Sequence, residues 1–122
     1  MKLSDIKLML NGILSFKDFK LNIFEEMTEY SSSSSIKGKS MPVYLTEDID
    51  LAIGENDLKV LCEAFLKDEL SEAEINYVAD ALLLSNRVFF EDEHVADRIG
   101  YLTDPEINGH LTKEVVRDIL ES

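Results

Sequence analysis

Apolar residues recur every three or four positions through most of the chain, a spacing that places them on one face of an α-helix. The clearest example is the series Phe16, Phe19, Ile23, Met27 and Tyr30. A denser apolar stretch over 6–14 follows Ser4, whose hydroxyl can cap a helix. We therefore predict a short, well-buried helix after Ser4 and a second helix over 16–30.

The middle of the chain carries explicit helix start signals. Asp57 is a candidate N-cap for a helix over about 58–68. Ser71 and Glu74 have the spacing of a capping box, in which each side chain accepts the backbone N–H of the other, so the next helix runs over about 72–85. The short link between these two helices predicts an antiparallel hairpin.

The last third of the chain continues in the same way. A helix through Val95, Ile99 and Leu102 is predicted, and Asp104-Pro105 breaks it because proline cannot continue a helix. Thr112 then caps a final helix. The fold class is thus mainly α, a compact bundle of about six helices with helical hairpins.

Two segments depart from the helical pattern. Residues 31–40 begin with five serines and have almost nothing to bury, which predicts a flexible Ser-rich loop within a single helical domain over 1–122. Met41–Leu45 contains Pro42 and the strand-favouring pair Val43-Tyr44, so this stretch is a candidate for one short extended segment.

Acidic residues are concentrated after Leu45. The chain has 25 Asp and Glu against 12 Lys and Arg, for a formal net charge of -13. Residues 1–45 hold 5 acids and 6 bases, whereas 46–122 hold 20 acids and 6 bases. Such a field repels nucleic acid and attracts cations, although a self-repelling surface that maintains solubility would have the same composition.

The single cysteine and the absence of a long apolar segment indicate in which cellular compartment the protein is expected. Cys62 lies in an apolar helical pattern between Leu61 and Phe65, which predicts a buried thiol and no disulfide. No segment has the length of a membrane span, and the N-terminus lacks the uncharged core of a signal peptide. We expect a cytoplasmic protein that does not contact membranes.

No catalytic or cofactor-binding residues can be assigned. The chain has no Gly-x-Ser-x-Gly elbow and no phosphate-cradling glycine loop, so we expect no enzymatic activity and no cofactor. His94 and His110 lack the spacing of a zinc site. The segment 104–109 has the first oxygen ligands and the glycine of a calcium loop, but Val115 stands where the closing Glu belongs, so no metal ligands are assigned.

With catalysis unsupported, binding of a basic protein is the function that the charge favours. The candidate partner-binding residues are acids at two successive predicted helix starts, which a bundle could present on one edge: Glu72, Glu74, Glu91, Asp92, Glu93 and Asp97. The same residues could merely cap helices and stabilise their dipoles, which needs no partner.

Three stretches carry a family resemblance: 54–58, 82–85 and 105–112, within about the last 70 residues. They resemble immunity proteins of bacterial contact-dependent growth inhibition systems. The resemblance implies a small, cytosolic, non-enzymatic antitoxin that neutralises a toxin domain, often a nuclease, delivered by a neighbouring cell. No binding-site motif and no toxin identity can be carried over from it.

The sequence therefore favours an acidic antitoxin that covers the active site of a cognate basic toxin domain without contacting nucleic acid itself. Two alternatives stay open: a calcium-responsive helical protein that uses Asp104 to Asn108, and a nucleic-acid mimic that inhibits a DNA-binding protein. The oligomeric state of the free protein is also open.

Overall fold

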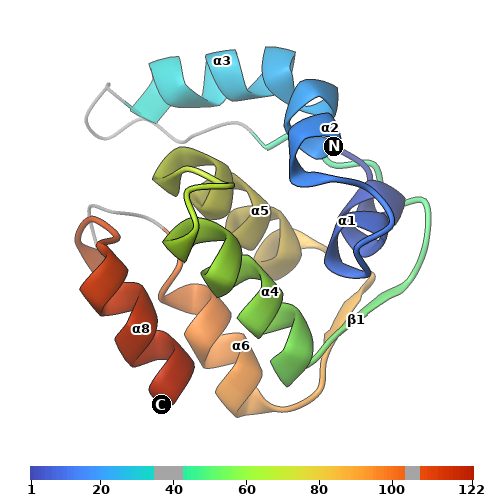
Figure 1. Cartoon of the computed structure of the whole chain (residues 1–122). Coiled ribbons are helices and arrows are strands. Elements are labelled where there is room, and N and C mark those ends of the chain that lie inside the picture. Colours follow the sequence, from blue (N-terminus) through green and yellow to red (C-terminus); the bar gives the residue numbers. More distant parts are fainter. Residues whose placement is uncertain (35–42, 104–107) are drawn as a thin grey trace.

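The computed structural model describes residues 1–34, 43–103 and 108–122, with the backbone alone for 31–34. These residues form a mainly helical fold with seven helices and one small sheet, which confirms the predicted class (Figure 1). The elements in chain order are α1 (Leu3–Leu10), α2 (Phe16–Asn22), α3 (Phe24–Ser34), β1 (Leu51–Ile53), α4 (Glu55–Leu66), α5 (Glu72–Leu84), β2 (Val88–Phe90), α6 (Glu93–Gly100) and α8 (Lys113–Glu121).

Helix α1 begins earlier than predicted, and Ser4 is not its cap. The N-cap is Lys2, which makes no side-chain capping bond, and Ser4 lies in the first turn. Its backbone N–H donates to Oδ1 of Asp48 at 3.0 Å, and its hydroxyl donates to the other carboxylate oxygen. A carboxylate from a distant loop thus serves the helix start, which no local pattern could indicate.

The predicted single helix over 16–30 is two helices that change direction at Ile23 (Figure 1). Ser15 caps α2 by accepting the N–H of Asp18 at 3.1 Å. Phe19, Ile23 and Tyr30 are all buried, so the apolar series continues across the break and conceals it. A single turn residue at Ile23 shifts the axis without moving the apolar face away from the core.

Helix α3 also continues to Ser34, four residues into the predicted loop. Serine costs a helix only a few tenths of a kcal/mol per residue, so an established helix can extend through such a run. The rest of that predicted loop, 35–40, lies outside the described residues.

Helices α4 and α5 form the predicted hairpin, with one correction at its start. Gly54 is the N-cap of α4, and Asp57 lies at the third helical position, where its carboxylate accepts the Gly54 N–H at 2.9 Å. Asp57 therefore serves the helix start from inside the helix. The capping box of α5 is confirmed, since Ser71 and Glu74 exchange bonds of 2.8 and 3.2 Å.

A two-stranded parallel sheet joins the chain on either side of this hairpin. Strands β1 and β2 pair with Leu51 opposite Val88 and Ile53 opposite Phe90. Neither strand was predicted, since three apolar residues in a row fit several structures. In the candidate extended segment, 43–45 form no strand, Thr46 makes an isolated bridge with Lys2, and 41–42 lie outside the description.

Helix α4 is central, because it contacts α1, α5, α6 and α8 (Figure 1). Thr112 caps α8 as predicted, with its hydroxyl accepting the Val115 N–H at 3.1 Å. The predicted break at 104–105 falls outside the described residues. None of the helices in the described part of the chain is long and apolar enough to cross a membrane.

Candidate functional site

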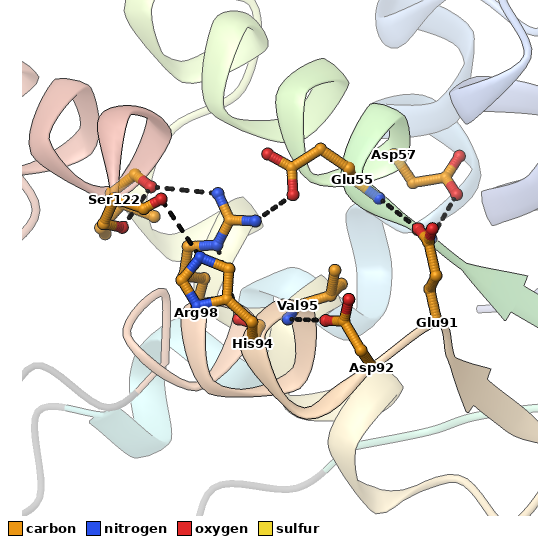
Figure 2. Close-up of polar contacts among 10 residues, drawn as sticks. Glu55, Asp57, Glu91, Asp92, His94, Val95, Arg98 and Ser122 are labelled. Carbon is orange, nitrogen blue, oxygen red and sulfur yellow. Dashed lines mark hydrogen bonds and ion pairs between the residues drawn. The ribbon is translucent and has the colours of Figure 1, made fainter.

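The starts of α5 and α6, near which the six acids predicted to bind a partner are found, lie at opposite ends of α8. Glu72, at the start of α5, accepts the backbone N–H of Leu111, just before α8. His94, in the first turn of α6, lies 3.1 Å from the carbonyl oxygen of Ser122, just after α8 (Figure 2). The nine residues of α8 span about 13 Å at about 1.5 Å per residue. The structure therefore does not bring Glu72 and Glu74 to one edge with the acids of α6.

Glu72 and Glu74 are engaged within the protein. In addition to the Leu111 N–H, Glu72 contacts Nδ1 of His110 at 2.8 Å. Glu74 closes the capping box and lies 3.8 Å from the ammonium group of Lys20. Both carboxylates are partly buried, so they serve the structure where α5, α2 and the approach to α8 meet.

Glu91 and Asp92 hold the start of α6 and its link to α4 (Figure 2). Glu91 follows β2 and accepts the backbone N–H of Glu55 at 3.2 Å, at the first position of α4. Asp92 is the N-cap of α6 and accepts the Val95 N–H at 2.9 Å. Each carboxylate satisfies a backbone donor that the helix itself leaves unpaired.

Glu93 and Asp97 differ from the other four. Both are exposed, and neither carboxylate forms a hydrogen bond or ion pair with any residue that the structure describes. They lie four residues apart on α6, hence on one face, and Tyr101 continues that face after four more residues. The Tyr101 side chain is 56% exposed. We call Glu93, Asp97 and Tyr101 the α6 stripe.

Helix α6 also carries a buried cation that the sequence analysis missed. Arg98 is only 2% exposed, and its guanidinium contacts a carboxylate oxygen of Glu55 and lies 3.4 Å from the carbonyl of His94 and 3.5 Å from that of Ile119 (Figure 2). The hydrogen bond from Arg98 holds the pKa of Glu55 below its ordinary value. Arg98 thus joins α4, α6 and α8, and the only signal in the sequence was a lone Arg among apolar helix positions.

A second polar network, also missed, joins α3 to α5. The Tyr77 hydroxyl donates to Glu26 at 2.6 Å and accepts the backbone N–H of Tyr44 at 3.0 Å. Tyr30 packs edge-on against the Tyr77 ring, with 4.8 Å between centroids, and donates to Asp80 at 2.8 Å. Burial and the Glu26 carboxylate raise the pKa of Tyr77, which keeps its hydroxyl protonated as a donor.

No arrangement in the described residues points to a metal or a nucleophile. Within 1–34, 43–103 and 108–122 no three His, Cys, Asp or Glu side chains lie close enough to hold an ion. Asp104 and Glu106 of the calcium-like segment are outside these ranges. Cys62 is buried as predicted, and desolvation raises the pKa of its thiol to about 12, so little thiolate is available at neutral pH.

The chain matched nothing with which it was compared. Models of known protein families, curated proteins and solved structures all gave no match. The inference of function therefore depends on the residues described above.

Proposed function

We propose that this chain is an acidic binding protein, an immunity protein that neutralises a cognate basic toxin domain, a nuclease, by covering its active site. The observation that carries the proposal is the α6 stripe, in which two exposed carboxylates without an internal role adjoin the exposed aromatic ring of Tyr101. The resemblance of 54–58, 82–85 and 105–112 to contact-dependent growth inhibition immunity proteins supports the same function.

Stability does not account for the stripe. Two like charges four residues apart on a helix destabilise it by about 0.2–0.5 kcal/mol. For Glu93 this cost is offset by its place at the helix N-terminus, where the helix dipole favours an anion. Asp97 lies in the second turn, where the dipole gives less stabilisation. A pair that costs free energy in the isolated protein is reasonable where a cationic partner compensates it on binding.

The rest of the molecule supports the stripe in two ways. The net charge of -13 attracts a basic partner over long range and speeds encounter. Tyr101 adds a large exposed aromatic surface, and tyrosine is enriched among the residues that dominate binding free energies. Arg98 holds the inner side of α6 in place, so the stripe is presented on a fixed helix.

The test begins with affinity capture of the partner by the full chain from its own cells. The partner is expected to be basic, and the Glu93→Lys, Asp97→Lys variant is expected to weaken its binding by about tenfold or more. The matched control is Glu114→Lys, Asp118→Lys, an exposed pair four residues apart on α8 with the same change of charge. Equal affinities for the stripe variant and the wild type would refute the assignment.

A further inference from the structure

An open apolar groove of about 1020 Å³ lies where α1, α2 and the start of α3 meet the end of α4. Its apolar lining includes Leu10, Leu14, Phe16, Met27, Val60 and Ala64. This volume is at the top of the range for small-molecule pockets, and the groove is partly open to solvent. Its dimensions favour a protein segment as the occupant.

Apolar side chains also project beside the groove. Ile13, Leu21 and Phe24 are 74%, 64% and 66% exposed, and Leu21 and Phe24 form part of the lining. The same face thus presents both a hollow and the apolar side chains that could fill one. Exposed apolar surface gathered in this way marks an interaction site more often than a random surface does.

The charges around the groove are balanced. Lys20 is paired with Glu74 at 3.8 Å, and Asp68 with Lys113 at 3.1 Å. The rim residues that make no ion pair with the described part of the chain are two lysines and two glutamates, Lys17, Lys67, Glu63 and Glu69. The rim therefore presents equal numbers of unpaired positive and negative groups.

We propose that this groove is a self-association surface, and that its occupant is the α2–α3 corner of a second copy of the chain. A two-fold dimer brings one patch against itself, so the patch must contain both the hollow and the side chain that fills it, and both signs of charge. The groove meets both requirements: Phe24 of each copy would enter the groove of the other, and lysines would face glutamates.

The distribution of charge over the whole chain favours the same occupant. At a net charge of -13, two copies repel each other over most of their surface. Residues 1–45 are nearly neutral, with 5 acids and 6 bases, and they supply most of the groove. A second copy can therefore approach this face at low electrostatic cost. The proposal does not depend on the α6 stripe.

Sedimentation velocity over a wide range of protein concentration tests the dimer, with circular dichroism to verify folding. Phe24→Glu is expected to raise the dimer dissociation constant by about tenfold or more. Phe89→Glu is the matched control, because Phe89 is 57% exposed on β2, outside the groove. A wild-type chain that stays monomeric at every concentration, or equal weakening by both substitutions, overturns the proposal.

Charge exchange then distinguishes a second copy from a foreign partner. The Lys17→Glu, Lys67→Glu variant is expected to dimerise more weakly than Lys7→Glu, Lys59→Glu, which makes the same charge change outside the groove. Adding Glu63→Lys and Glu69→Lys restores a self-complementary rim and is expected to restore the dimer. If this fourfold variant stays as weak as the twofold one, self-association through the rim is wrong.

Discussion

The helices before the sheet and those after it use charge differently. Among the described residues of α4 to α8 and of the loop before β1, seven carboxylates accept hydrogen bonds from backbone N–H groups: Glu47, Asp48, Asp57, Glu72, Glu74, Glu91 and Asp92. Within residues 1–34, the Glu26 carboxylate accepts hydrogen bonds from the Met1 amine and the Tyr77 hydroxyl, and the Glu29 carboxylate accepts one from the Tyr44 hydroxyl.

This difference shows that a surplus of acid can be structural. Seven of the 20 acids after Leu45 accept backbone N–H groups, most of them at helix starts whose donors would otherwise be unpaired. Four of the six predicted interface acids are among these seven carboxylates, so Glu93 and Asp97 are the two of the six that the described residues do not engage. The helices of residues 1–34 instead leave apolar side chains exposed beside a groove.

The largest expected effect comes from removing the buried cation that joins α4, α6 and α8. Arg98→Ala leaves a cavity and removes the partner of Glu55, so the free energy of unfolding should fall by about 3 kcal/mol. Lys113→Ala, which breaks the exposed pair with Asp68, should cost less than about 1 kcal/mol. Urea titrations compare the two, and similar losses would contradict a structural role for Arg98.

A smaller difference in the free energy of unfolding is expected between acids that cap a helix and acids without internal contacts. Asp92→Ala removes the N-cap of α6 and should cost about 1 kcal/mol, whereas Glu93→Ala, one residue later and without contacts in the described structure, should stay within about 0.5 kcal/mol. Both variants lose one negative charge, so net charge cannot explain a difference. Equal costs in thermal unfolding would remove the distinction between the two groups.

The smallest expected effect is on the free energy of unfolding at acidic pH. The pKa of Glu55 is lowered from its ordinary value of 4.5 by the hydrogen bond from Arg98, so the folded state favours the ionised carboxylate. The contribution of the ionised Glu55 carboxylate to the free energy of unfolding is complete above that ordinary value. It is lost as the pH falls through the lowered pKa. Glu55→Gln should therefore flatten the decline of stability below pH 4.5, and an unchanged slope would argue against the pair.

The sequence predicted the helices well where the signals were local. The capping box at Ser71 and Glu74 and the cap at Thr112 are formed as expected, because each needs only residues within one turn. The bend at Ile23 and the pairing of β1 with β2 were missed. The first keeps the apolar period intact, and the second joins three-residue segments that are far apart in the sequence.

The site was predictable only in part. Acids at helix starts were recognised as able to cap, but periodicity does not show which helix ends meet in space. Glu72 and the α6 acids proved to lie at opposite ends of α8. Tyr101 was missed, because a single aromatic near a helix end has no pattern that indicates exposure.

The most direct test of the binding account is the salt dependence of association and dissociation with the captured partner. The wild-type association rate should fall steeply as salt rises, because long-range attraction is screened. Both stripe and control variants should flatten that dependence, since each changes the net charge equally, but only Glu93→Lys, Asp97→Lys should also speed dissociation. If the stripe variant dissociates at the wild-type rate, the α6 stripe is not the contact surface.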